Sequence, residues 1–275
     1  MFKNEFISSI PLKAEAFAIK ELFDQSSNSI LYISKDDREI FNIKEKINWL
    51  LPKTDILIYR SWDQIPYDNV SPSKEIQSER IKTLYSLLKN NKKKIILTSI
   101  NAIIQKTIDQ NFLNENILEI SLNSKIDFND LVIKLSTLGY ERTSVVRDKS
   151  EFAIRGSIID IFLSDQENPI RLDFFNDKIE SIHSFDQITQ KRLTKLNISN
   201  LFINTSSELI LNIDSIELFR KNFREIFNNY RKSQIYHSFS DGILPPGGEQ
   251  FLPLFFKKMN TIFSYLKNID IILSS

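Results

Sequence analysis

Charged and aromatic side chains fall on one face of the segment 170–175, which reads IRLDFF. Side chains alternate between the two faces of a strand, so the isoleucine, the leucine and the first phenylalanine form a face suited to a core. The other face carries an arginine, an acid and an aromatic ring: Arg171, Asp173 and Phe175. Arginine and aromatic residues are enriched at protein–protein hot spots, because they combine contact area with directed hydrogen bonds. A protein-docking face is therefore one interpretation of this segment.

A second arginine can join this face. Arg155 lies in the extended segment 151–162, EFAIRGSIIDIF, and shares the face with Arg171 if the two segments pair. A simpler interpretation stays open, in which Phe175 folds over the edge of the sheet and both arginines are ordinary surface residues. The pattern alone favours this second interpretation. The acidic residues nearby form no evident acid–base pair: Asp160, Asp173 and Asp186.

The loop 61–73, SWDQIPYDNVSPS, offers a different chemistry. Trp62 and Tyr67 have rings that can stack on nucleic-acid bases. Aromatic residues beside prolines more often hold a long loop against its own domain, and we favour that role. The chain carries 36 Lys and Arg against 35 Asp and Glu, so its net charge of +1 gives no general attraction for nucleic acid.

Catalytic and cofactor sites are not indicated. The 275 residues include five glycines and none precedes a lysine, so neither a P-loop nor a GxGxxG fingerprint can form. Cysteine is absent, and the histidines, His183 and His237, lie far apart. We therefore expect no cofactor, no metal site and no enzymatic activity. No run approaches the ~20 apolar residues of a membrane span, and the first residues lack a signal-peptide pattern, so we expect a cytoplasmic protein without a membrane partner.

Alternating helices and buried strands predict an α/β fold for residues 1–116, with a parallel sheet covered by helices. Short apolar runs indicate strands at 30–34, 55–59 and 94–99. Helical periodicity and capping residues indicate helices at 12–23, 36–51, 74–90 and 100–108. A last apolar run, 270–275, can return to this sheet, so we expect residues from about 250 to 275 to complete the first domain.

From residue 117 the pattern changes to an α+β module. A strand at 117–122 and a helix at 127–139, capped by Asp127 and ended by Gly139, precede extended segments joined by turns: 141–147, 151–163, 168–175 and 178–185. We expect an antiparallel meander and a separable domain over 117–204. Residues 205–249 regain helical periodicity and form a small helical subdomain, with a capping box formed by Asp214 and Glu217.

Four stretches occur in an order found in a known family: SWDQIPYDNVSPSKEIQSERIKTLYSL, EFAIRGSIIDIF, PIRLDFFNDKIESIHSFDQITQ and DGILPPGGEQFLPLFF. From about residue 10 to the end, the chain resembles the amino-terminal region of the bacterial transcription-repair coupling factors, which is similar to the excision-repair protein UvrB. The resemblance implies a degenerate RecA-like domain without a P-loop, an inserted α+β UvrB-type interaction domain that docks on UvrA, and a small helical subdomain.

The resemblance also implies the site and the partners. The family's UvrA-contacting residues fall here on Arg155, Arg171 and Phe175, which turns the balance for Phe175 towards docking. These three side chains are expected to form one exposed patch. Removing one of them should therefore change the free energy of unfolding little. The implied function is a UvrA-recruiting adaptor in transcription-coupled nucleotide excision repair. In the longer family members RNA polymerase and double-stranded DNA are also partners and ATP drives a DNA translocase, and we expect those activities to belong to parts outside these residues.

Two alternative functions stay open. A UvrB-like excision-repair protein requires a P-loop near its amino terminus, where this chain has SSIPLKAEA (8–16). It also tends to carry an acid at the position of Ser157, directly after the Arg-Gly pair. A DNA-binding module that uses the loop of Trp62 and Tyr67 would show an affinity for DNA that falls steeply with salt.

The glycine count leads to a first prediction. We expect the chain neither to bind nor to hydrolyse ATP, because no glycine-rich loop can bring backbone N–H groups to the phosphates. Equilibrium titration with a fluorescent ATP analogue and a phosphate-release assay measure the two activities. Saturable binding at micromolar ATP would contradict the expectation.

Overall fold

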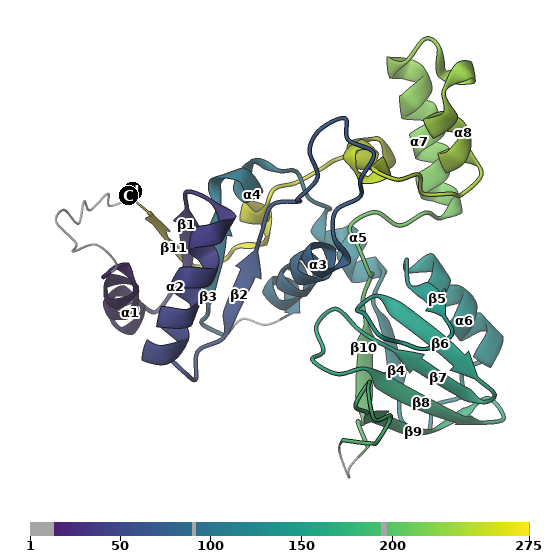
Figure 1. Ribbon diagram of the computed structural model, residues 1–275, viewed down its shortest axis with the longest axis horizontal. Helices are drawn as coiled ribbons and strands as arrows, with labels where there is room; N and C mark the ends of the chain where they lie inside the picture. The colour runs from purple at the N-terminus through teal and green to yellow at the C-terminus, as the bar shows by residue number, and fades with distance from the viewer. Residues whose placement is uncertain (1–13, 90–91, 194–196, 275) are drawn as a thin grey trace. The chain divides into compact units, whose positions relative to one another are not determined.

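The computed structural model describes residues 14–89, 92–193 and 197–274 (Figure 1). The chain divides into two compact units. The first comprises residues up to 61 together with 87–105 and 265–275, and the second comprises 62–86 and 106–264. Each unit has its own sheet and its own hydrophobic core, so each is described separately.

A parallel sheet forms the centre of the first unit. Its strand order is β11-β1-β3-β2, and every neighbouring pair in it runs parallel. The strands are β1 (Ser29–Ser34), β2 (Ile56–Tyr59), β3 (Ile95–Ser99) and β11 (Ile269–Leu273). The predicted return of the last apolar run to the first sheet is thus confirmed, because β11 pairs with β1. Almost every residue of β1 and β3 is buried, as expected for parallel strands with both faces covered.

Helices α1 (Glu15–Gln25) and α2 (Asp37–Leu50) pack on this sheet through apolar faces, which in α2 consist of isoleucines. Asp36 caps α2 by accepting hydrogen bonds from the amides of Arg38 and Glu39. The helix expected over 100–108 ends earlier: α4 covers Ile100–Ile104. Thr107 instead forms an isolated antiparallel bridge with Asn260, so its backbone is extended. A short helix that the pattern did not predict follows, α5 (Gln110–Glu115).

A five-stranded sheet with the order β5-β6-β7-β8-β9 dominates the second unit. Its strands are β5 (Glu141–Thr143), β6 (Glu151–Arg155), β7 (Ile158–Ile161), β8 (Ile170–Phe175) and β9 (Lys178–Ser184). Strands β6 to β9 form the antiparallel meander that the turns predict. The expectation fails for β5, which pairs parallel with β6. The physical reason is the connection 144–150, which carries the chain back along the sheet before β6 begins.

One face of this sheet is closed by helix α6 (Phe128–Thr137) and a two-stranded antiparallel ribbon of β4 (Leu118–Ser121) and β10 (Asn200–Ile203). Asp127 caps α6 through the amide of Asp130, as predicted. Gly139 follows the helix at φ +88°, and a Cβ there would lie 2.6 Å from the Ser206 hydroxyl oxygen. The buried residues of this core all lie between 120 and 203, so the core is complete within one stretch of chain.

The helical part of the second unit contains α7 (Ile213–Ile226), η1 (Tyr230–Lys232), α8 (Gln234–Ser240) and η2 (Gly248–Phe255). Phenylalanine rings from α7, α8 and η2 form its core. The capping box of α7 is formed by Asn212 and Ser215 and not by the predicted Asp214 and Glu217. The reason is that Asn212 still has extended backbone (φ −126°, ψ 173°) whereas Asp214 already lies inside the helix.

Helix α3 (Lys74–Lys89) carries the predicted apolar stripe and one buried cation. Arg80 is fully buried and forms an ion pair with Glu208, which also accepts a hydrogen bond from Thr107 at 2.6 Å. The Arg80 guanidinium lies 5.6 Å from the ring of Trp62. A buried pair of this kind fixes the helix in one position, because separating its partners would leave a charge buried alone.

The register of β8 leads to a second prediction. Phe174 is 6% exposed and packs edge-to-face on Phe128 at 5.1 Å, whereas its neighbour Phe175 is 64% exposed. We expect Phe174→Ala to lower the free energy of unfolding by ~3–5 kcal/mol, and Phe175→Ala to change it by less than ~1 kcal/mol. Urea denaturation of both variants measures the difference. The reverse order would mean that the strand presents its other face to the core.

Candidate protein-docking face

The side of the five-stranded sheet that faces away from α6 carries most of its polar side chains. We call it the polar face. In the ladder, Asp160 pairs with Arg171 and Arg171 pairs with His183. In the next row but one, Arg155 pairs with Ile158 and Ile158 pairs with Asp173. Residues paired across a sheet, and residues two apart along a strand, point to the same side. Arg155, Arg171 and Phe175 therefore share one face.

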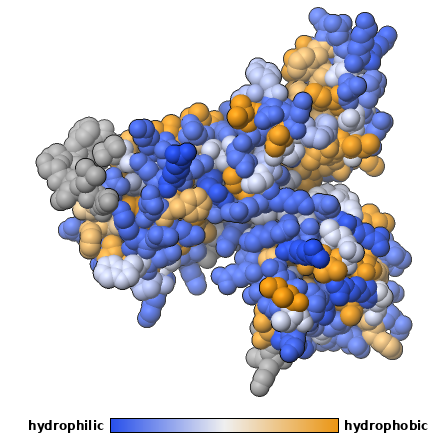
Figure 2. Space-filling model, in the orientation of Figure 1, coloured by the Kyte–Doolittle hydropathy of each residue, from blue (hydrophilic) through white to orange (hydrophobic). Residues whose placement is uncertain are grey.

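The three positions are spread evenly over this face. Arg155 lies in the same row as Asp173, two strands away, and Phe175 and Arg171 lie two residues from Asp173 in opposite directions along β8. With ~4.8 Å between strands and ~3.3 Å per residue, their Cα atoms form a triangle with sides of about 12–13 Å. A β-bulge between Asp173 and Phe174 shifts the pairing with β9 but keeps the alternation of β8. Figure 2 shows that the surface over β6–β9 mixes hydrophilic and hydrophobic residues.

Arg155 and Phe175 are exposed. Phe175 is 64% exposed, more than any other phenylalanine among the residues that the structure describes. Arg155 stands at the end of β6, directly before the turn at Gly156, where φ is +60°. Within the residues that the structure describes, its guanidinium has no ion-pair or hydrogen-bond partner. The two side chains thus offer one apolar ring and one positive charge that no described residue compensates.

Arg171 is held differently, and here the expectation of a uniformly exposed patch is wrong. Its Nε donates to Asp160 Oδ1 at 2.7 Å and its Nη2 to Asp160 Oδ2 at 2.9 Å. Nη2 also donates to Gln190 Oε1 at 2.9 Å, and the guanidinium lies 4.4 Å from the centre of the Phe185 ring. The hydrogen bonds with Asp160 raise the pKa of Arg171 further. The side chain of Arg171 is 16% exposed because Asp160, at 1%, draws it down onto the sheet.

The supporting residues Asp160, Phe185 and Gln190 were not predicted as part of the site. Asp160 carries a usable signal, because it is an acid inside the apolar strand sequence IIDI and alternation places it on the polar side. Phe185 and Gln190 carry none, since both lie beyond the end of β9, where no periodicity applies.

Ser181, His183 and Asp173 lie together on the same face without forming a catalytic triad. The Ser181 hydroxyl donates to Asp173 and lies 3.1 Å from His183 Nδ1, and Asp173 Oδ2 lies 3.7 Å from the same nitrogen. In a triad the acid and the serine must contact opposite nitrogens of the imidazole. Burial lowers the pKa of His183, which favours its neutral form at pH 7. The cluster is a packing element of the face.

The structure separates the two aromatic residues of the loop 61–73. Trp62 packs against the aromatic core of the helical part. Tyr67 is 93% exposed, at φ +68°. The loop is fastened to the segment 247–250 by hydrogen bonds from Gln64 Nε2 to the Gly247 carbonyl at 2.9 Å and from the Tyr67 amide to Gln250 Oε1 at 3.0 Å. The favoured role of holding the loop in place therefore fits Trp62, while Tyr67 projects from an anchored loop.

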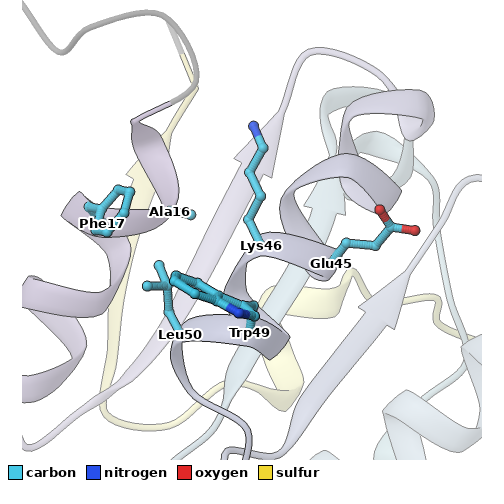
Figure 3. Close-up of a pocket in the computed structure, with 6 residues that line it drawn as sticks. All are labelled: Ala16, Phe17, Glu45, Lys46, Trp49 and Leu50. Atoms are coloured by element: carbon cyan, nitrogen blue, oxygen red, sulfur yellow. The ribbon is translucent and has the colours of Figure 1, made fainter.

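The other surface features suggest no catalytic chemistry. A hollow of about 440 Å³ lies between α1 and α2, where the Trp49 ring lies beside Leu50 and the Lys46 side chain points away (Figure 3). Its lining is mainly apolar, with Glu45 and Lys46 as the charged residues among those that line it. Across residues 14–89, 92–193 and 197–274, no three acidic or histidine side chains are grouped to hold a metal ion. In the same part of the chain, no helix is long and apolar enough to cross a membrane.

The contrast between the two arginines leads to a third prediction. Arg171→Ala leaves Asp160 buried without its cation, so we expect the free energy of unfolding to fall by about 3 kcal/mol or more. Arg155→Ala removes an exposed side chain and should change it by less than ~0.5 kcal/mol. Urea denaturation compares them, and adding Asp160→Asn to Arg171→Ala should recover part of the loss. Equal, small effects would show that the ion pair contributes nothing to folding.

Comparison with known proteins identifies the second unit's sheet. Residues 118–206 match the family model of the UvrB interaction domain, a span that contains β4 to β10 and the whole polar face. The chain is 34% identical over 265 residues to the transcription-repair-coupling factor of Haemophilus influenzae, which covers 96% of this chain and 23% of that protein. Against the factor of Escherichia coli it is 29% identical, with 91% and 22% covered. The factor of Borreliella burgdorferi is 35% identical over 177 residues.

The chain thus spans about a quarter of the length of these relatives. Their match runs through both compact units, and the expected α/β class with a parallel sheet is confirmed by the structure. The four motifs, the domain match and the nearly complete alignment agree. The chain belongs to the transcription-repair-coupling factors, a family of DNA-repair proteins, and corresponds to their amino-terminal, UvrB-homologous region.

Proposed function

We propose that this chain recruits UvrA through the polar face of its UvrB interaction domain, as an adaptor in transcription-coupled nucleotide excision repair. The observation that carries the proposal is the common face of Arg155, Arg171 and Phe175, on which an aromatic ring and an arginine without a partner among the described residues are both exposed. Phe175 is the most exposed phenylalanine among the described residues, and an exposed ring on one face with arginines is the combination of residue types enriched at protein interfaces.

The exposed side chains of the polar face determine which groups a partner must offer. Phe175 needs an apolar pocket, and burying a ring of this size typically contributes ~2 kcal/mol or more. Arg155 needs an acidic side chain, because its charge is uncompensated within the described residues. The partner surface should therefore offer an acidic side chain and an apolar hollow spaced to match Arg155 and Phe175, whose Cα atoms lie about 12 Å apart, as a protein surface can.

The longer family members are expected to bind RNA polymerase and double-stranded DNA as well. We do not assign either of these two partners to the residues of this chain. The loop of Tyr67, the candidate for DNA stacking, carries Asp63 and Asp68 and has no lysine or arginine between positions 61 and 73. Such a loop repels a phosphate backbone, so the polar face is the better-supported binding site.

Titration of the chain with cognate UvrA in a calorimeter gives a fourth prediction. Phe175→Ala should weaken binding by about 30-fold, the factor that a hot-spot loss of ~2 kcal/mol produces. Arg155→Ala should weaken it as well, and by less as salt increases, because an exposed charge is screened.

Two matched variants control this experiment. Phe17 is 59% exposed and belongs to the first compact unit, so Phe17→Ala removes a comparable ring far from the sheet in sequence. Arg142 is exposed on β5, where it pairs with Phe152 and thus lies on the opposite side from Arg155. Both should bind UvrA as the unaltered chain does. Unchanged affinity in Phe175→Ala and Arg155→Ala would overturn the proposed function.

A further inference from the structure

The guanidinium of Arg171 is only partly used by the fold. An arginine has five N–H donors. Nε and Nη2 supply the hydrogen bonds to Asp160 and Gln190. The donors of Nη1 have no acceptor among the residues that the structure describes. One flat side of the group lies against Phe185, which is fully buried. The guanidinium is therefore held by hydrogen bonds along one edge and by the Phe185 ring on one face. The two N–H groups of Nη1 remain available to a partner.

Gln190 reaches Arg171 from a turn with its own internal order. Asp186 accepts hydrogen bonds from the Thr189 amide and hydroxyl, each at 2.7 Å, and the Gln190 amide donates to the Asp186 carbonyl at 2.8 Å. Gln190 itself has φ +59°, a left-handed conformation that costs energy for a residue of this type. Its Nε2 donates to a backbone carbonyl of the same turn at 2.8 Å, which directs Oε1 to Arg171.

This arrangement serves orientation more than folding. Asp160 alone neutralises Arg171 and makes the bidentate pair. The additional hydrogen bond to Gln190, a residue with a strained backbone, further restricts the orientation of the guanidinium. Neutralising the buried charge of Asp160 does not require this restriction. A donor pair fixed before the partner arrives loses less entropy on binding.

We propose that Gln190 is a positioning residue of the docking face, which together with Asp160 and Phe185 holds Arg171 as a preorganised, charge-neutral donor whose Nη1 pair binds an acceptor on UvrA. The proposal rests on the proposed function and goes beyond it in two ways. It adds a residue outside the strands to the site, and it gives the two arginines different tasks: Arg155 supplies charge, and Arg171 supplies direction.

The two tasks differ in their response to salt. Screening weakens the attraction of the uncompensated charge on Arg155. The ion pair with Asp160 cancels the charge of Arg171, so its contribution is a short-range hydrogen bond that salt screens much less. The loss of affinity caused by disturbing Arg171 should therefore persist at salt concentrations where the effect of Arg155→Ala has become small.

The test is calorimetric titration of the full chain with UvrA at low and at high salt, using Gln190→Asn. Asparagine tolerates φ near +60° and keeps the amide, but it is one methylene too short to reach Arg171. We expect binding to weaken by about tenfold at both salt concentrations, with the folding midpoint unchanged. Gln187→Asn is the matched control, because it makes the same substitution in the same turn at an exposed side chain. We expect it to leave the affinity for UvrA unchanged.

The result with Phe175→Ala separates this proposal from the proposed function. If Phe175→Ala weakens binding and Gln190→Asn behaves like Gln187→Asn, the positioning role is overturned and the docking face stands. If the loss in Gln190→Asn disappears at high salt, Arg171 acts through charge and the proposal is again overturned. If neither Phe175→Ala nor Gln190→Asn weakens binding, the docking face itself is wrong and the positioning role falls with it.

A second measurement needs no partner. In the ¹H–¹⁵N NMR spectrum of the unaltered chain, the Nη2 protons of a clamped Arg171 should exchange slowly with one another. Gln190→Asn should speed their exchange, because rotation about the Cζ–Nη2 bond then breaks one hydrogen bond fewer. Equal exchange in both chains would show that Gln190 does not hold the group and would overturn the proposal.

Discussion

The ion pair between Asp160 and Arg171 is the interaction on which the polar face depends. The two residues are direct ladder partners on β7 and β8, and Asp160 is almost completely buried. A shift of one residue in this pairing would turn one strand over relative to the other, which would place either Asp160 or Arg171 in the apolar core without its partner. The pair therefore selects one register of the sheet, and that register places Phe175 in solvent and Phe174 in the core.

The sheet keeps folding and recognition on opposite sides. Its apolar face is closed by α6 and by the ribbon of β4 and β10, within a single stretch of chain. Among the described residues the polar face is covered only in part, by the turn that brings Phe185 and Gln190 to Arg171, and the ring of Phe175 remains in water. Arg171 belongs to both sides of this division, because part of its guanidinium stabilises the sheet and part is left for a partner. A residue can thus contribute to binding and to folding without conflict, since different N–H groups serve each.

Much of the site followed from short-range patterns. Period-two alternation placed Arg171 and Phe175 on one face, and the buried apolar runs predicted the parallel strands of the first unit. Patterns of this kind are reliable because they follow from backbone geometry within a few residues. They were less reliable where several local solutions compete: Asn212 and not Asp214 caps α7, and the helix after β3 ends at Ile104 because Thr107 pairs with Asn260.

The amino-acid sequence by itself determined which side chains each strand can offer, and the absence of a glycine-rich phosphate loop. Tertiary structure alone decided which strands are neighbours: that Arg155 joins the face of Arg171, that β5 runs parallel to β6, and that Gln190 returns over the sheet to the guanidinium. The physical reason is the separation along the sequence of the residues that decide each feature. Alternation is set by adjacent residues, whereas strand pairing and the placing of a turn depend on how distant segments share one core, which no local pattern records.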